Sequence, residues 1–233
     1  MIKNSRSVMK NFEVKNAATI IVLRGSNENS KVLMGQRGEG ASFMPNKFVF
    51  PGGAVDKGDS GIIPDDKINK EMLLNLKMKS ESGIESAIVA AGIRELWEET
   101  GLILGSFSKH TPTTQHKSWE EFFKNGYQPN AKNMDLVFRA ITPPGRTRRF
   151  DARFFLVNSE NIHGDLDDFS NASGELSHLQ WIGLTAAESL DLPIITQIVL
   201  KEVYSIMNGS SQSGYPFYYH DGGTSHFERL RRN

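Results

Sequence analysis

The chain has 233 residues, a formal net charge of zero at pH 7 and no cysteine. This length allows one domain with a sizeable core, or one domain with an inserted lobe, and the balanced charge gives no overall field to recruit nucleic acid or a membrane surface. The absence of cysteine excludes disulfides, thiolate metal sites and cysteine nucleophiles, and it is compatible with the cytoplasmic location that we expect. The longest apolar run near the N-terminus, Ala17–Leu23, is too short to span a bilayer, so we expect no membrane partner.

The N-terminal part of the chain predicts a tail and then a β-hairpin. Residues 1–16 are polar and basic, which is typical of a flexible tail before a domain. The runs Ala17–Arg24 and Lys31–Arg37 are rich in β-forming residues, and turn-forming Gly, Ser and Asn lie between them. We therefore expect these runs to pair, and a short strand to follow at Lys47–Phe50, before a Gly-Gly turn.

The rest of the chain alternates helical and extended patterns. Apolar residues recur at helical spacing over Asp65–Lys79, and a second helix is expected near Ser118–Phe123, whose aromatic side chains either pack inward or stack on a nucleobase. Three strands and an apolar helix are then expected at Met134–Ile141, Phe150–Val157, Leu176–Ile182 and about Ile194–Met207. Mixed strands with helices on both sides describe an α/β/α sandwich with a mixed β-sheet. We expect one domain over residues 17–210 and a C-terminal tail over residues 211–233.

The most informative segment is Arg94–Leu102, where Glu95, Glu98 and Glu99 fall at positions i, i+3 and i+4 of a predicted helix. This spacing places the three carboxylates on one face, which we expect to be turned toward solvent and away from an apolar face. Like charges four residues apart repel, and acids near a helix C-terminus oppose the helix dipole, so the arrangement costs roughly 1 kcal/mol in a bare helix. A bound divalent cation would reverse that cost. Oxygen ligands suit Mg²⁺ or Mn²⁺, and Mg²⁺ usually brings substrate phosphates with it.

Local signals predict both ends of this helix. Ser82 and Glu85 have the spacing of a capping box, which would start the helix and give Glu85 a structural role. Gly101 is the residue expected to end it, because glycine readily adopts the left-handed conformation that follows a helix.

The segment resembles the signature of the Nudix hydrolase family, which is a Gly, five residues, a Glu, seven residues and then Arg-Glu-apolar-x-Glu-Glu-x-Gly-apolar. The second half is matched at every fixed position from Arg94 to Leu102. The first half departs from the pattern, because Ser86 stands where the Glu is expected and the Gly-Gly pair lies far upstream, at Gly52–Gly53 in a Phe-Pro-Gly-Gly run. A helical insertion at about residues 56–83 separates the halves. Such an interruption is similar to the branch of the family that includes peroxisomal coenzyme A diphosphatases.

The resemblance implies a Nudix-type sandwich and a set of metal ligands. Glu95, Glu98 and Glu99 would bind Mg²⁺ or Mn²⁺, directly or through water, together with the backbone carbonyl of Ala54. Arg94 lies four residues before Glu98, and we expect it to orient the glutamates by ion pairing rather than to touch the substrate.

Other residues are expected to hold the substrate. A Gly-Gly turn lets the backbone approach a ligand closely, the guanidinium group of arginine matches phosphate geometry, and one arginine before the turn resembles a feature of coenzyme A diphosphatases. The residues predicted to bind substrate are Gly52, Gly53, Arg37, Arg146, Arg148 and Arg149. The last three, and Arg153 after them, either contact phosphate or cover a surface loop.

The catalytic base is expected either outside or inside the signature helix. Glu175 ends a polar acidic segment, Asp165–Glu175, which we expect to be mobile and which lies just before a predicted strand, so Glu175 is one candidate. The alternative is that this segment is a solvated connection and that Glu98 serves as base.

The chemistry implied by the resemblance is hydrolysis of a phosphoanhydride bond in a nucleoside diphosphate linked to another group. A coenzyme A-type or dinucleotide-type diphosphate is the favoured substrate, with ADP-ribose or a sugar nucleotide as alternatives. A non-catalytic ligand sensor is a second class of function, although a sensor has no need of three clustered acids. Action on capped or triphosphorylated RNA is a third, which the neutral charge argues against. Because family members are often dimers, the resemblance also leaves a homodimer open.

Overall fold

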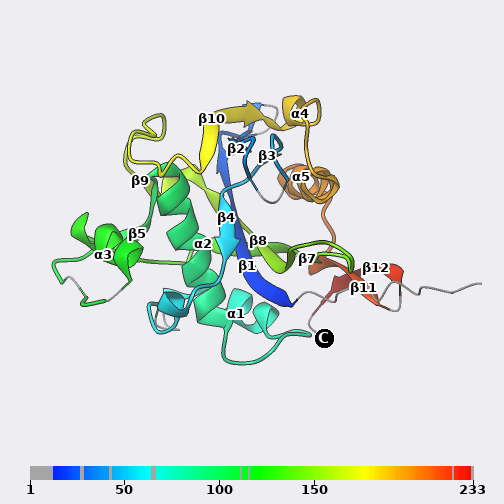
Figure 1. The fold of residues 1–233 in the computed structure, drawn as a ribbon, viewed down its shortest axis with the longest axis horizontal. Helices are drawn as coiled ribbons and strands as arrows, with labels where there is room; N and C mark the ends of the chain where they lie inside the picture. The colour runs from blue at the N-terminus through cyan, green and yellow to red at the C-terminus, as the bar shows by residue number, and fades with distance from the viewer. Residues whose placement is uncertain are drawn as a thin grey trace, which may run out of the picture.

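A mixed β-sheet lies at the centre of the fold (Figure 1). The computed structural model describes residues 13–26, 29–41, 44–63, 67–110, 112–114, 116–221 and 223–231. Within these residues, nine strands form one sheet in the order β10-β2-β1-β8-β7-β11-β12, with β3 paired to β2 and β4 paired to β1. They are β1 (Val14–Arg24), β2 (Lys31–Arg37), β3 (Phe48–Val49), β4 (Gly52–Ala54), β7 (Met134–Ile141), β8 (Arg149–Asn158), β10 (Leu176–Gly183), β11 (Tyr215–Asp221) and β12 (Thr224–Leu230). A small sheet has the order β6-β5-β9, from β5 (Ile103–Phe107), β6 (Tyr127–Pro129) and β9 (Ile162–His163).

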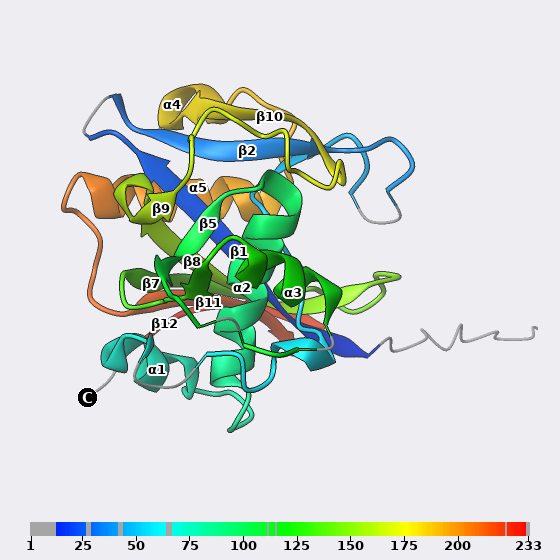
Figure 2. The ribbon, with the colours of Figure 1, turned by 90° about the vertical axis from the view of Figure 1, so that its left-hand side faces the viewer.

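Helices cover both faces of the central sheet. The helices and 3₁₀ turns are η2 (Lys57–Asp59), α1 (Lys70–Leu76), α2 (Glu85–Thr100), α3 (Lys117–Lys124), η4 (Ser159–Asn161), α4 (Leu184–Ala187) and α5 (Ile194–Met207). Figure 2 looks onto the face that carries α1, α2 and α3, and α5 lies behind the sheet. No helix over the described residues is long and apolar enough to cross a membrane.

Strand β1 separates two hydrophobic cores. Its residues Ala18, Ile20 and Val22 pack in the cluster that contains α2, whereas Ile21 and Leu23 pack in the cluster that contains α5. Successive side chains of a strand point to opposite faces, and β1 pairs in parallel with β8, so this strand is buried on both sides. The predicted α/β/α sandwich with a mixed sheet is therefore confirmed.

Several element boundaries match the prediction and others do not. Strands β2 and β7 and helix α5 have the predicted ends. Residues 1–12 of the expected tail lie outside the described residues, but β1 begins at Val14, so the end of that segment belongs to the sheet. The helix predicted from Asp65 begins at Lys70 and ends at Leu76, and residues 64–66 lie outside the described residues.

The start of α2 also differs from the prediction. Ile84, not Ser82, occupies the N-cap position and no side chain caps the helix there, so the predicted capping box is wrong. Instead, the buried carboxylate of Glu85 accepts a hydrogen bond from the backbone N–H of Gly83 at 2.9 Å, which gives Glu85 a structural role. Gly101 ends the helix in the left-handed conformation, as predicted.

The segment predicted to be a C-terminal tail is part of the core. Strands β11 and β12 form a hairpin, and β11 pairs in parallel with β7. Tyr215 and Phe217 are 2% and 4% exposed, and the guanidinium of Arg139 lies 4.4 Å from the Phe217 ring centroid. The prediction for residues 211–233 was wrong because aromatic burial against β7 is a long-range contact that local polarity does not reveal.

If the hairpin stabilises the fold, Phe217→Ala should lower the free energy of unfolding by about 3–5 kcal/mol, as expected for a buried aromatic side chain. Phe227→Ala is the matched control in β12, because Phe227 is 59% exposed, and it should cost about 1 kcal/mol or less. Urea unfolding of both variants measures this difference. Equal losses would contradict a core role for β11.

Candidate active site

The second half of α2 packs closely against strands β1 and β4. Gly92 makes this close approach possible, because a Cβ atom there would lie 2.8 Å from Cδ1 of Ile20 on β1. The helix therefore carries its three signature glutamates directly over the Gly-Gly turn of β4. Residues far apart in the sequence are brought together here, as the resemblance to the interrupted signature predicted.

Glu99 is bound to the backbone of that turn. Its Oε2 accepts a hydrogen bond from the N–H of Gly52 at 2.8 Å, and the residue is only 1% exposed. Burial, and then the charge of Glu95, raises the pKa of the Glu99 carboxyl well above its ordinary value. The expectation that the acidic face is turned toward solvent is wrong for Glu99, because β4 covers that face.

Glu95 lies against the other glycine of the turn. A Cβ atom at Gly53 would lie 2.4 Å from the Glu95 carboxylate, so no larger residue fits without a shift of one of them. Burial raises the pKa of Glu95 to about 7, although Arg94 lowers it, and the charges of Glu98 and Glu175 raise it further. The two glycines thus allow two carboxylates to sit close to the backbone.

Arg94 joins these groups through five hydrogen bonds. Its Nη1 donates to Glu95 Oε1 at 2.8 Å and to Glu98 Oε2 at 2.9 Å, which includes the expected ion pair with Glu98. Its Nη2 donates to the carbonyl oxygen of Ala54 at 2.9 Å. Burial by itself lowers the pKa of Arg94, but the hydrogen bonds that Arg94 donates to Asp59 and the charges of the nearby acids outweigh it and raise the pKa above its ordinary value.

Asp59 is a site residue that the sequence interpretation missed. Its carboxylate is fully buried and accepts hydrogen bonds from Nε and Nη2 of Arg94 at 2.8 and 3.0 Å. A sequence signal was present, because Asp59 follows Gly53 after five residues, which is the spacing of the first half of the signature with Asp in place of Glu. The interruption therefore begins after Asp59 rather than at about residue 56, and Ser86 has no part in the signature.

Glu175 and Arg37 lie at the edge of the same cluster. Their side chains form an ion pair at 3.2 Å, with Glu175 59% and Arg37 19% exposed. The charge of Glu175 raises the pKa of both Glu95 and Glu99, so it acts on the buried acids.

The segment that precedes Glu175 is fixed at several points. The N–H of Ser173 donates to the carbonyl of Glu98 at 2.7 Å, and Nε1 of Trp181 donates to the carbonyl of Leu166 at 2.8 Å. Gly101 at the end of α2 also lies against this segment, because a Cβ there would be 2.9 Å from Asn171. The expectation of a mobile connection does not agree with these contacts.

The arginines of the β7–β8 loop are not brought to the glutamates. Arg146 and Arg148 are exposed, and no hydrogen bond or ion pair among the described residues joins either of them to the three acids. Nε of Arg149 donates to the carbonyl of Thr142. Arg153 is buried, forms an ion pair with Asp151 and donates a hydrogen bond to Ser80, so it supports the fold.

The oxygen atoms of Glu95, Glu98, Glu99 and the Ala54 carbonyl are of the type that a hard divalent cation prefers, but their present positions do not form a coordination shell. Among the described residues, no three His, Cys, Asp or Glu side chains are grouped so that they could hold one ion. One oxygen each of Glu95 and Glu98 is bound to Arg94. The raised pKa values of Glu95 and Glu99 reflect buried negative charge without enough positive charge beside it, which a cation such as Mg²⁺ or Mn²⁺ would supply.

Comparison with known proteins supports the same class. No family model matches the chain. The chain is 28% identical over 148 residues to "Putative nudix hydrolase 7" of Caenorhabditis elegans. The matched region covers 64% of this chain but only 36% of that protein. It also resembles the crystal structure of a Nudix hydrolase from Alicyclobacillus acidocaldarius, with a TM-score of 0.58 and 25% identity over 81% of this chain and 90% of that one. Together with the signature on α2, these matches show that the chain is similar to Nudix hydrolases in sequence and in fold.

The raised pKa of Glu95 predicts a dependence of stability on pH. Because the folded state holds a proton that the unfolded state releases above pH 4.5, the free energy of unfolding should fall as pH rises toward about 7. The loss should be on the order of 2–3 kcal/mol without metal. Chemical unfolding in EDTA across this range measures it, and Glu95→Gln should show a clearly smaller loss. Identical pH dependence of the two proteins would contradict the raised pKa.

Proposed function

We propose that this chain is a Mg²⁺- or Mn²⁺-dependent hydrolase of the phosphoanhydride bond in a nucleoside diphosphate linked to another group. The observation that carries the proposal is the convergence of Glu95, Glu98, Glu99 and the Ala54 carbonyl around Arg94 and the Gly-Gly turn. Scission of a phosphoanhydride requires charge neutralisation at phosphate oxygens and a positioned water. The bound cation would supply the first, and it would be held by these carboxylates and this carbonyl.

The chain itself would supply the base and part of the phosphate binding. Glu175 is partly exposed beside the acidic cluster, and we assign it the role of base. As the water oxygen bonds to phosphorus, its proton passes to the Glu175 carboxylate, and the bridging oxygen leaves with the bonding electron pair on the second phosphate. Arg37 holds Glu175 in the ground state and is free to turn toward the substrate phosphates when Glu175 accepts the proton.

The favoured substrates stay a coenzyme A-type or dinucleotide-type diphosphate, with ADP-ribose or a sugar nucleotide as alternatives. Phosphate contacts by Gly52, Gly53, Arg146, Arg148 and Arg149 remain predictions, as do a cytoplasmic location and a homodimer. A non-catalytic sensor is less well supported, since four buried or half-buried acids gathered at one site destabilise a fold that does not need them. A panel of these diphosphates with Mg²⁺ and with Mn²⁺, with products identified by mass, tests the proposal directly.

Glu99→Gln should lower kcat by roughly 100-fold or more while the fold survives. Gln keeps an oxygen that can accept from the N–H of Gly52, but it lacks the charge that the cation needs. Glu188→Gln, at an exposed position at the end of α4, is the control and should retain full activity. Wild-type turnover of Glu99→Gln at saturating Mg²⁺ would show that Glu99 is not a metal ligand.

Glu175→Gln tests the base. The variant should lose the acidic limb of the pH dependence of kcat and about 100-fold or more in kcat, because the proton acceptor is gone. Asp168→Asn, in the same segment, should change neither. A normal pH profile with unchanged kcat in Glu175→Gln would leave Glu98 as the candidate base.

A further inference from the structure

The carboxylate of Asp59 is held from both sides. Besides the two bonds from Arg94, its Oδ1 accepts a hydrogen bond from Nε1 of Trp119 at 3.0 Å, and its Oδ2 accepts from the N–H of Asp56 at 2.8 Å. Asp59 and Trp119 are both 0% exposed. A buried charge is tolerated only when its partners are well placed, so each of these donors constrains where the carboxylate lies.

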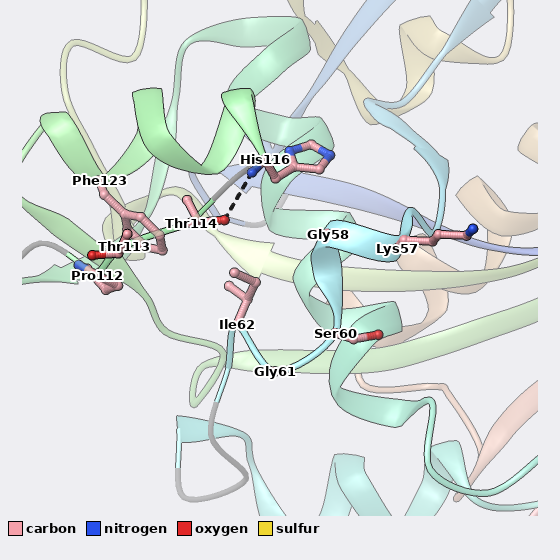
Figure 3. A pocket seen from close by; sticks show the side chains of 10 residues that line it. All are labelled: Lys57, Gly58, Ser60, Gly61, Ile62, Pro112, Thr113, Thr114, His116 and Phe123. Carbon is pink, nitrogen blue, oxygen red and sulfur yellow. Dashed lines mark hydrogen bonds between the residues drawn. The ribbon is translucent and has the colours of Figure 1, made fainter.

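Helix α3 contacts the Asp59 turn at a second point. The ring of His116, at the N-cap of α3, lies over Gly58, as Figure 3 shows. A Cβ atom at Gly58 would be 2.1 Å from Cδ2 of His116, so the ring is packed directly on the backbone next to Asp59. His116 and Phe123 of α3 both line a cavity of about 370 Å³ that the turn also borders through Gly58 and Ser60. Helix α3 therefore contacts the turn both through Trp119 and through His116.

The indole of Trp119 is itself immobilised. It packs against the rings of Phe122 and Phe123 with centroid distances of 5.4 and 5.8 Å. This settles the sequence alternatives for these aromatic residues in favour of packing, since all three are at most 3% exposed. A rigid donor on one side of Asp59 fixes the carboxylate, and the carboxylate fixes the guanidinium of Arg94 on the other side.

We propose that Trp119 is a positioning residue for the metal site, acting through Asp59 and Arg94. The chain of contacts runs from α3 through Trp119 and Asp59 to Arg94, and from there to the acids of α2 and the Ala54 carbonyl. This inference rests on the proposed function, because it concerns how well those oxygens are placed to bind a cation. Hydrogen-bond partners beyond the ligands typically change metal affinity or activity by about 10- to 100-fold.

Trp119→Phe in the full chain tests this proposal. Phe keeps the aromatic packing but removes the N–H that Asp59 accepts. We expect an apparent Mn²⁺ affinity, measured by electron paramagnetic resonance, about 10-fold weaker than that of the wild type. We expect kcat to fall by a similar factor and KM for the nucleotide to stay within twofold. A purely structural defect would instead lower the melting temperature in EDTA and leave the affinity of the folded protein unchanged.

Trp97→Phe is the matched control. Trp97 packs against the same Phe122 ring, at 6.2 Å, and no hydrogen bond from its indole to the described residues is present. It should bind Mn²⁺ like the wild type, and an equal loss in both variants would overturn the inference. If Trp119→Phe does not fold, Asp59→Asn keeps the size of the side chain but removes the charge that Trp119 and Arg94 hold in place. Wild-type Mn²⁺ affinity in that variant would overturn the inference as well, because Trp119 acts only through Asp59.

Failure of the proposed function gives a different result. If the wild type binds no Mn²⁺ and hydrolyses none of the diphosphates, the proposed function is wrong and this inference fails with it. If the wild type binds Mn²⁺ and Trp119→Phe binds it equally well, only the positioning role of Trp119 is overturned.

Discussion

The candidate site depends on one buried guanidinium group. Arginine has five N–H donors in a rigid plane, and in Arg94 they meet five acceptors: two oxygens of Asp59, one each of Glu95 and Glu98, and the carbonyl of Ala54. These acceptors belong to three separate elements, η2, β4 and α2. Because the guanidinium group is planar, it fixes the relative directions of η2, β4 and α2, which a lysine with its single ammonium group could not do. The two halves of the interrupted signature are thus joined by a side chain.

The charges of this cluster do not balance. Arg94 brings one positive charge to three carboxylates, and Glu99 adds a further acid whose partner is the neutral N–H of Gly52. The imbalance is the reason that burial and mutual repulsion raise the pKa values of Glu95 and Glu99. A fold optimised only for stability would avoid it. The same buried negative charge favours a divalent cation, so the property that destabilises the protein on its own is the one that suits the site to bind a metal.

Local signals in the sequence were sufficient for strands β1, β2, β7, β8 and β10, for α2 and for the signature acids, because periodicity and the Arg-Glu-Glu spacing are local properties. The resemblance to the signature predicted that the Gly-Gly turn meets these acids. The burial of Glu99 could not be predicted, since it depends on β4 crossing the acidic face of the helix. Asp59 is predictable from its spacing after Gly53, whereas the spacing counted back from Arg94 places the missing acid at Ser86. The hairpin of β11 and β12 was missed because its partner, β7, lies far away in the sequence.

The interruption of the signature is tolerated because both of its ends are anchored. Residues 60–93 separate Asp59 from Arg94, where the signature has seven residues, but loop-closure entropy grows by only about 0.6 kcal/mol for each doubling of length. The extra cost is therefore on the order of 1–2 kcal/mol. The hydroxyl of Tyr215 donates to a backbone carbonyl in α1, and Arg139 donates to two carbonyls just after it. Strand β11 carries Tyr215, and its Phe217 ring packs against the Arg139 guanidinium, so the C-terminal hairpin fixes the inserted segment near α1. At the other end, α3 fixes the segment through the hydrogen bond from Trp119 to Asp59. Elements without chemistry of their own thereby determine whether the separated halves of the site can meet.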